Sequence, residues 1–412
     1  MIPRLPAPVR AFNAVGRALQ LRRLPFASLD PDELERRAAA RAGVEPDVPT
    51  LFREGLRVLA RSLEDEAALT PLGRITARRR ILSLLESRAR LAADRARLPG
   101  IADEKIERPL VVVGLPRTGT TLLHTLLAQD PATRSPLFWE VREPSPPPAG
   151  DDVTDDPRIA ACSAELEGLY RLLPEFRAVH PMEARWPQEC VAITAQAFVS
   201  MQHSTTWRVP SYAEWLGRQD HAPAYEFHRR FLQHLQHGRP RRRFVLKTPG
   251  HLWTLGALFS AYPDAGVIHT HRDPVRVLAS LCSLETLLRK IASDAIDPAE
   301  LGREWAPRLA QGLALASAFR EAAPARAAQF AVVHYAELMA DPLGVVERIY
   351  ARFELPLSAE ARERMSAFLR ANPSDKHGVH RYRLGDFGLN EAEERRRVAA
   401  YMSRYGVAEE KV

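Results

Sequence analysis

The segment of residues 109–121, PLVVVGLPRTGTT, constrains the fold more than any other part of the sequence. Its three consecutive valines predict a short buried strand. A loop from Gly114 to Gly119 follows, and the apolar pattern after it predicts a helix that begins at Thr120. A strand, a glycine-bounded loop and a helix turn backbone N–H groups and the positive end of the helix toward a phosphate. We therefore expect a phosphate-binding loop here.

This loop differs from that of nucleoside triphosphatases at the position of their lysine. The spacing from Gly114 to Gly119 matches the GxxxxG of a P-loop, but Thr120 stands where the lysine would contact the β- and γ-phosphates. The cation lies inside the loop instead, at Arg117. The predicted strand 267–271 also lacks the acidic end that holds Mg²⁺ in those enzymes. These residues predict a site for a single 5′-phosphate, with Arg117 reaching beyond it.

The rest of the chain predicts an α/β fold with a central parallel sheet of about four to five strands flanked by helices. Helical patterns separate the short buried strands that we predict at residues 109–114, 243–247, 266–271 and 330–334. Such alternation is typical of a parallel sheet with helices on both faces, and ligands bind at the carboxyl ends of its strands. Four polar residues stand at or just after those ends: Arg117, Lys247, Arg272 and Tyr335.

The chain is expected to comprise two domains. Residues 1–105 form an N-terminal helical extension, with a helix start at Asp30 and apolar residues at helical spacing after it. Residues 106–412 form the domain that carries the phosphate loop. Within this domain, residues 150–240 follow a proline cluster and predict a helical insertion. Its clearest helices are expected at residues 191–207 and 225–237.

The composition of the chain limits the classes of protein to which it can belong. The net charge of +7 suits an anionic ligand, but it is too diffuse to require a nucleic acid, and we expect no such partner. The three cysteines lie far apart, which argues against a disulfide framework or a zinc site and for a reducing, cytoplasmic location. No apolar run approaches the ~18 residues of a membrane-spanning helix. The basic, faintly amphipathic segment 1–26 is expected to pack on the body of the protein or to contact a membrane surface.

Four motifs, in order along the chain, resemble those of sulfotransferases that use 3′-phosphoadenosine-5′-phosphosulfate (PAPS). GLPRTGTT resembles the 5′-phosphosulfate loop of that family, [KR]-[ST]-G-T-[ST]. Arg272 and Ser280, eight residues apart, match the pair that holds the 3′-phosphate. Lys247 matches the lysine near the transferred group, and Tyr335 in HYAELMADP matches the tyrosine beside the adenine. The resemblance covers roughly residues 108–385 and is closest to the bacterial and tyrosylprotein-type branch.

The resemblance implies a P-loop-like sulfotransferase fold and an enzyme that uses PAPS as its co-substrate and requires no metal. A sulfuryl group would pass in line from PAPS to a hydroxyl, which releases adenosine 3′,5′-bisphosphate. The charge that develops on the leaving oxygen must then be neutralised and the acceptor held in line. The resemblance assigns that task to Arg117 and Lys247. It assigns the 5′-phosphate to the loop residues Thr118, Gly119, Thr120 and Thr121.

Two residues are candidates for the general base that takes the proton of the acceptor. Glu140 matches the glutamate base that tyrosylprotein-type enzymes carry in an E-x-R context, where Arg142 would orient it. His251 is the rival. Cytosolic members use a histidine two residues after the lysine, whereas His251 stands four residues after Lys247. Both candidates stay open, and Glu140 is favoured.

The sequence departs from the family at two donor contacts. Leu122 stands where many cytosolic members have a tryptophan on the adenine, so we expect Tyr335 to supply that contact. The Arg-Lys-Gly clamp near the C-terminus of the family is absent. Arg381, in the basic segment 376–383, is expected to replace it at the 3′-phosphate, unless that segment is only an exposed basic turn.

We expect the 150–240 helices to line the acceptor pocket. Three tryptophans of this region suit an apolar or aromatic acceptor, although core packing is their commoner role: Trp186, Trp207 and Trp215. The acceptor can be a hydroxyl on a small molecule, a lipid or a glycan. Two other functions stay open. A nucleotide kinase or other P-loop phosphotransferase would need Mg²⁺ and a lysine in place of Thr120, and an inactive nucleotide-binding module would bind the donor without turnover.

Overall fold

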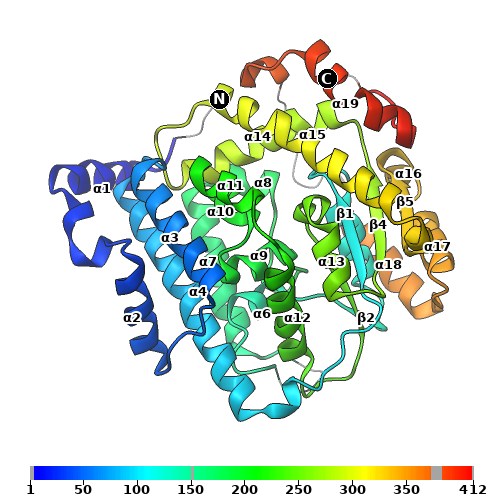
Figure 1. Ribbon diagram of the computed structural model, residues 1–412, viewed down its shortest axis with the longest axis horizontal. Helices are drawn as coiled ribbons and strands as arrows, with labels where there is room; N and C mark the ends of the chain where they lie inside the picture. The colour runs from blue at the N-terminus through cyan, green and yellow to red at the C-terminus, as the bar shows by residue number, and fades with distance from the viewer. Residues whose placement is uncertain (1–3, 149, 151–152, 373–382, 411–412) are drawn as a thin grey trace.

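The computed structural model describes residues 4–148, 150, 153–372 and 383–410, and a parallel sheet of five strands lies at its centre (Figure 1). The strands are β1 (Leu110–Gly114), β2 (Thr133–Arg134), β3 (Arg243–Lys247), β4 (Gly266–His271) and β5 (Phe330–His334). They follow the order β2-β3-β1-β4-β5, and each neighbouring pair is parallel. The α/β class and the four predicted strands are confirmed. The sequence did not indicate β2, because two residues are too few to show a periodicity.

Helices make up most of the described chain. The first four are α1 (Ala7–Ala18), α2 (Pro31–Ala42), α3 (Thr50–Asp65) and α4 (Pro71–Arg97). The segment between β1 and β3 contains α5 (Thr120–Leu127), α6 (Phe138–Arg142), α7 (Pro157–Leu172), α8 (Pro174–Val179), α9 (Cys190–Thr194), α10 (Met201–Thr206), α11 (Pro210–Gly217) and α12 (Ala222–Gln236). The remainder contains α13 (Leu255–Ala261), α14 (Pro274–Lys290), α15 (Pro298–Ala322), α16 (Tyr335–Ala340), α17 (Pro342–Arg352), α18 (Ala359–Ala371) and α19 (Glu391–Tyr405). Within the described ranges, no helix combines the length and the apolar character needed to cross a membrane.

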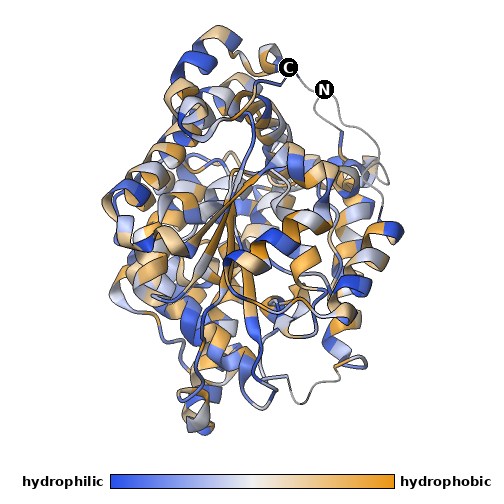
Figure 2. Cartoon of the chain, turned by 90° about the vertical axis from the view of Figure 1, so that its right-hand side faces the viewer, coloured by the Kyte–Doolittle hydropathy of each residue, from blue (hydrophilic) through white to orange (hydrophobic). Residues whose placement is uncertain are grey.

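Alternate residues of the strands are buried against different layers of helices. Leu110 and Val112 of β1 share a core with α5, α17 and α18. Val111 and Val113 face the other side, where α12, α13, α14 and α15 cover the sheet. Figure 2 shows the mostly hydrophobic strands between these layers. Because both faces are covered, the strands read as nearly continuous apolar runs, which made them recognisable in the sequence.

The N-terminal helices share a hydrophobic core with part of the 150–240 region. Residues of α2, α3 and α4 pack with Phe198, Trp207, Tyr212 and Trp215. Gly55 of α3 permits this contact, because a Cβ there would lie 2.4 Å from the carbonyl oxygen of Phe198. The extension and the insertion therefore bury one apolar surface together.

The helix predicted over residues 191–207 is interrupted, which corrects the sequence-based expectation. α9 ends at Thr194, a 3₁₀ turn follows at Ala195–Ala197, and α10 begins only at Met201. Phe198 between them has a φ of +54°, outside the helical region. Its carbonyl accepts a hydrogen bond from the Tyr212 hydroxyl at 2.9 Å, so a tertiary contact holds the break. The helical spacing of the apolar residues did not reveal it.

Candidate active site

The loop between β1 and α5 presents a helix N-terminus at the carboxyl edge of the sheet. Gly119 precedes α5 as its N-cap with a φ of +82°, and within the described chain no side chain caps that helix. A Cβ at position 119 would lie 2.6 Å from Leu338, so both space and conformation favour glycine there. The first N–H groups of an α-helix lack partners inside the helix. Thr120 and Thr121 begin α5 at this end, and an uncapped helix N-terminus of this kind can bind an anion.

Thr118 and Arg117 have different surroundings in this loop. Thr118 is buried, and its hydroxyl donates to the Leu115 carbonyl at 2.7 Å and shares a 2.7 Å hydrogen bond with the Thr270 hydroxyl. Its hydroxyl thus holds the loop onto β4. Arg117 has a φ of +65°, its side chain is exposed, and its Nη1 lies 3.4 Å from the Val179 carbonyl. The loop therefore projects its cation outward.

An ion pair that the sequence did not predict lies beside α5. Lys247, the last residue of β3, is buried, and its Nζ donates to Oε1 of Glu189 and lies 3.4 Å from the Thr121 hydroxyl. The Thr248 hydroxyl donates to the other oxygen of Glu189 at 3.2 Å. Burial raises the pKa of Glu189, but the charge and the hydrogen bond of Lys247 outweigh burial and hold that pKa below its usual value. Glu189 is thus a carboxylate at neutral pH.

A cavity of about 460 Å³, the inner cavity, begins at this carboxylate. Leu115 and Pro116 of the loop form part of its wall beside Glu189. Its other walls come mainly from α4, α6, α7, α8, α10, α14, α15 and the turn Pro249–Trp253. Most of the lining residues are apolar, among them Phe138, Val141, Leu169, Phe176, Trp253, Leu281, Leu284, Leu288, Ile291, Trp305 and Leu309. The inner cavity therefore suits an acceptor with a mainly apolar body.

His180 marks the polar end of the inner cavity. Burial lowers its pKa, with smaller electrostatic effects from three neighbours, Glu189, Lys247 and Arg117. His180 is therefore neutral at pH 7. The structure brings a cation from the loop, a cation from β3 and a carboxylate to the same end of an apolar cavity.

Arg272, the first residue after β4, is held by a carboxylate from the C-terminal segment. Its Nε and Nη2 donate to the two oxygens of Glu410, each at 2.8 Å, and its Nη1 donates to the Arg117 carbonyl at 2.7 Å. The guanidinium lies 3.8 Å from the centroid of the Tyr335 ring. Glu410 thus places an anion in the fork of Arg272, in the geometry that a phosphate would use.

The surroundings of Arg272 also anchor the end of the described chain. Asp273 caps α14, and its Oδ2 accepts from the backbone N–H of Glu410 at 2.8 Å and from Arg395 at 3.2 Å. Ser280, on α14, is buried. Arg381, expected at the 3′-phosphate, lies outside the described residues.

Glu140 lies apart from this group. Its carboxylate is fully buried, and Oε1 accepts from Arg134 at 2.9 Å and from Arg239 at 2.7 Å. Oε2 accepts from the backbone N–H of Leu137, at the start of α6, at 2.9 Å. Both oxygens are therefore engaged in holding α6. The carboxylate borders a different cleft from the inner cavity.

The structure also separates His251 from the Lys247–Glu189 pair. His251 is buried, and its Nδ1 is 2.5 Å from the Tyr225 hydroxyl. Burial lowers its pKa to about 3. Its ring borders a second cavity, and Glu189 is not among the residues that line that cavity. His251 is thus neutral, with one ring nitrogen engaged.

The contacts of Arg142 and of the three tryptophans differ from those that the sequence predicted. Arg142 pairs with Glu165 at 2.7 Å instead of orienting Glu140. Trp207 and Trp215 pack in the core shared with the N-terminal helices, and Trp186 borders the cleft beside Glu140. The tryptophans on the inner cavity are Trp253 and Trp305, which lie outside the 150–240 region.

Sequence reasoning missed Glu189 and His180 because both lie in irregular segments without a motif. It also missed the contribution of α4, which places Thr76, Arg79 and Arg80 on the wall of the inner cavity. Only the sequence position of Glu189, just after a proline and before an apolar run, hinted at a turn near a buried site. Within the residues that the structure describes, no group of three or more His, Cys, Asp or Glu could hold a metal ion.

Comparison with solved structures gives two close matches in shape. Sulfotransferase STF9 from Mycobacterium avium shares 31% identity, covers 92% of this chain and 98% of its own, and has a TM-score of 0.86. Sulfotransferase STF1 from Mycobacterium tuberculosis shares 35% identity, covers 90% and 98%, and has a TM-score of 0.78. Because each match leaves only about a tenth of this chain uncovered, both extend into the N-terminal helical region, residues 1–105.

Comparison with curated proteins gives a weaker match. The omega-hydroxy-beta-dihydromenaquinone-9 sulfotransferase Stf3 of Mycobacterium bovis is 26% identical over 267 residues, which are 60% of this chain. The chain spans 63% of the length of that relative. The model of the sulfotransferase family matches residues 109–359, from β1 to the start of α18 and more than half of the chain. The predicted resemblance is confirmed, and the chain belongs to the sulfotransferase family.

Proposed function

We propose that this protein transfers a sulfuryl group from PAPS to a hydroxyl acceptor and releases adenosine 3′,5′-bisphosphate. The observation that carries the proposal is the ion pair between buried Lys247 and half-buried Glu189, which lies between the N-terminus of α5 and a mainly apolar cavity. In-line sulfuryl transfer is promoted by a cation at the donor and a general base at the acceptor, and a carboxylate can act as that base.

The donor would lie along the carboxyl edge of the sheet. The N-terminus of α5, with Thr120 and Thr121, holds the 5′-phosphate through backbone N–H groups and hydroxyls. Arg117 and Lys247 neutralise the charge that develops on the bridging oxygen and on the sulfuryl group. Arg272 holds the 3′-phosphate after it releases Glu410.

Three further residues complete the proposed donor site. Ser280 and Arg381 assist Arg272 at the 3′-phosphate. Tyr335 stacks on the adenine once Arg272 leaves its ring.

Glu189 is the group that we assign as the general base. Its carboxylate opens onto the inner cavity, whereas both oxygens of Glu140 are engaged by arginines and a backbone amide. His251 is neutral and borders the other cavity. When Lys247 turns toward the donor, its hold on Glu189 weakens and the pKa of that carboxylate rises. Glu189 is then a stronger base at the moment when the donor is in place.

The apolar wall of the inner cavity favours a small-molecule or lipid alcohol over a glycan, because a glycan would leave many hydroxyls without partners there. The name of the relative Stf3, a sulfotransferase of a hydroxylated menaquinone, supports an acceptor of this kind. We therefore propose an apolar alcohol as the acceptor.

Helix α1 supports a contact with a membrane surface that would supply such an acceptor. It packs on α4 through a small and a polar residue, Gly16 and Asn13. Its larger apolar residues Phe12, Val15 and Leu19 share one helical face and are 41%, 57% and 69% exposed. An apolar stripe that faces water, next to several arginines, fits a lipid surface with anionic headgroups. In this proposal the protein is cytoplasmic and docks on that surface reversibly.

Calorimetry tests the donor assignment. Adenosine 3′,5′-bisphosphate is expected to bind with micromolar affinity or better in the presence of EDTA, and ATP with Mg²⁺ is expected to bind far more weakly. Sulfuryl transfer from ³⁵S-labelled PAPS to simple alcohols then tests the reaction. A preference for ATP with Mg²⁺ would favour a P-loop phosphotransferase instead. Binding of the bisphosphate without transfer to any alcohol would favour an inactive nucleotide-binding module.

A further inference from the structure

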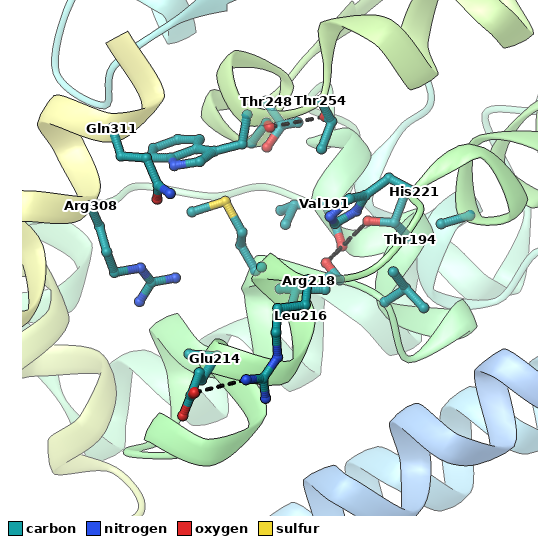
Figure 3. A pocket seen from close by; sticks show the side chains of 18 of the residues that line it. Val191, Thr194, Glu214, Leu216, Arg218, His221, Thr248, Thr254, Arg308 and Gln311 are labelled. Carbon is teal, nitrogen blue, oxygen red and sulfur yellow. Dashed lines mark hydrogen bonds and ion pairs between the residues drawn. The ribbon is translucent and has the colours of Figure 1, made fainter. Parts of the chain in front are cut away.

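A second cavity of about 640 Å³, the outer chamber, lies beside the inner cavity and apart from the donor residues. Helices α11 and α15, the start of α12 and the turn Pro249–Trp253 surround it. In Figure 3, Arg308 and Gln311 of α15 stand on one side, and Thr194 and His221 stand on the opposite side. Glu214 of α11 and Arg218, the residue after that helix, lie together at a third side. The chamber is as large as many sites for drug-sized ligands.

The outer chamber and the inner cavity share part of their walls. The residues common to both are Val191, Met201, Thr248, Gly250 and Trp253. Thr248 is also the residue whose hydroxyl donates to Glu189 at 3.2 Å. The shared wall therefore lies next to Glu189, the carboxylate that we assign as the base. A ligand that extends from the outer chamber into the inner cavity would place its end beside this carboxylate.

Most charged side chains of the outer chamber pair with one another, and Arg303, which also lines it, pairs with Asp297 at 3.2 Å. Three arginines of the chamber each donate a hydrogen bond to a glutamate: Arg218 to Glu214 at 2.9 Å, Arg208 to Glu300 at 2.8 Å, and Arg308 to Glu304 at 2.7 Å. The walls between them are apolar and include Val199, Leu216 and Ala224. Such a lining accommodates an uncharged apolar ligand and gives a charged one little advantage.

Two glycines shape the boundary between the cavities. A Cβ on Gly312 would lie 2.6 Å from the Trp253 indole, so this glycine lets the ring pack directly on α15. A Cβ on Gly250 would lie 3.5 Å from the Met201 sulfur, which is ordinary contact. A larger side chain at position 250 therefore fits the backbone but extends into the shared wall, where Met201 is the adaptable neighbour.

We propose that the outer chamber binds the apolar body of an elongated acceptor whose terminal hydroxyl reaches Glu189 past Gly250 and Met201. The acceptor class is a long, uncharged alcohol with a hydrocarbon or aryl chain. This inference rests on the proposed function and adds the shape of the substrate. Each methylene that leaves water improves binding about fourfold, so acceptors that occupy both cavities are strongly preferred over those that fill one.

A series of primary alcohols from 1-butanol to 1-hexadecanol tests the proposal in the full-length protein. The kcat/KM of the wild-type enzyme is expected to rise about fourfold per methylene over the lengths that enter the outer chamber. Gly250→Leu obstructs the passage. It is expected to lower kcat/KM for 1-hexadecanol at least about tenfold more than kcat/KM for 1-butanol, and to change the affinity for adenosine 3′,5′-bisphosphate by less than about threefold.

Gly168→Leu is the matched control, because a Cβ there, on α7, meets nothing within 4 Å and the residue lines neither cavity. An equal loss at every chain length, or no loss, in Gly250→Leu would overturn the outer chamber as part of the acceptor site. Failure to bind the bisphosphate, or to transfer to the short alcohols, would overturn the proposed function instead.

A binding measurement gives a readout that does not depend on turnover. 16-Bromo-1-hexadecanol is expected to quench tryptophan fluorescence, and Trp253→Phe is expected to remove much of that quenching. Quenching that is unchanged in Trp253→Phe would place the chain elsewhere and overturn the proposal.

Discussion

Replacing Glu410 with glutamine is expected to tighten the binding of adenosine 3′,5′-bisphosphate. Glu410 holds Arg272 through two hydrogen bonds of 2.8 Å, and a 3′-phosphate needs the same guanidinium. Donor binding must therefore break the pair. A glutamine at position 410 keeps the size of the side chain but loses the charge and one acceptor oxygen, so Arg272 is released at a lower cost.

The magnitude follows from the exposure of the pair. The side chains of Arg272 and Glu410 are 15% and 33% exposed, so solvent screens the attraction only in part. Hydrogen bonds between charged groups contribute about 1.5–3 kcal/mol net, and part of this remains with glutamine. We expect Glu410→Gln to improve the Kd of the bisphosphate by about 1–2 kcal/mol, or roughly fivefold to thirtyfold.

Calorimetry at 50 mM and 500 mM NaCl checks this expectation. The gain is expected to shrink at high salt, because added ions weaken the pair in the wild-type protein. Glu409→Gln is the matched control. Glu409 is 69% exposed and lies 3.6 Å from Arg395, so its loss should change Kd less than about twofold. An equal or weaker affinity of Glu410→Gln would refute the competition between Glu410 and the 3′-phosphate.

Three further predictions concern other parts of the chain. Glu189→Gln should lower kcat by about 10²–10⁴-fold with bisphosphate binding retained. Glu140→Gln should mainly lower the Tm, because the buried arginines Arg134 and Arg239 lose a charged partner. Equal losses of kcat in the two variants would contradict a catalytic role for Glu189 and a structural role for Glu140. Burial raises the pKa of Glu285 to about 8, so its neutral form contributes stability that is present at acidic pH and is lost as pH rises toward 8. Glu285→Gln should therefore reduce the fall of Tm between pH 5 and pH 8. An unchanged dependence of Tm on pH would contradict a buried neutral carboxyl at this position. Leu19→Glu should weaken co-sedimentation with vesicles that contain phosphatidylglycerol, whereas Leu315→Glu, at a similarly exposed apolar residue on α15, should not; equal effects would refute a specific role of α1.

The sequence predicted the strands and the polar residues at their carboxyl ends because both depend on local patterns. Buried β-branched runs marked β1, β3, β4 and β5. The positions of Arg117, Lys247 and Arg272 at or after strand ends are confirmed, and the carboxyl ends of parallel strands meet at one edge. These inferences needed no knowledge of long-range packing.

The proposed acceptor site depends on contacts between distant segments, which no local pattern records. Glu189 is identified by its contact with Lys247, 58 residues away in the chain. Glu140 has the expected neighbours in sequence, but Arg134 and Arg239 engage its carboxylate in the fold. The break at Phe198 likewise follows from a hydrogen bond to Tyr212. Tertiary packing decided all three.

The shared core of the N-terminal helices and the 197–224 segment has a consequence for engineering. Because α3 packs against α11, and α4 also supplies part of the wall of the inner cavity, specificity is not carried by a single exchangeable block. A chimaera that takes only residues 150–240 from a relative would join mismatched surfaces at Gly55 and Trp215. Transfer of acceptor preference between members of this family therefore requires that α3, α4 and the insertion move together.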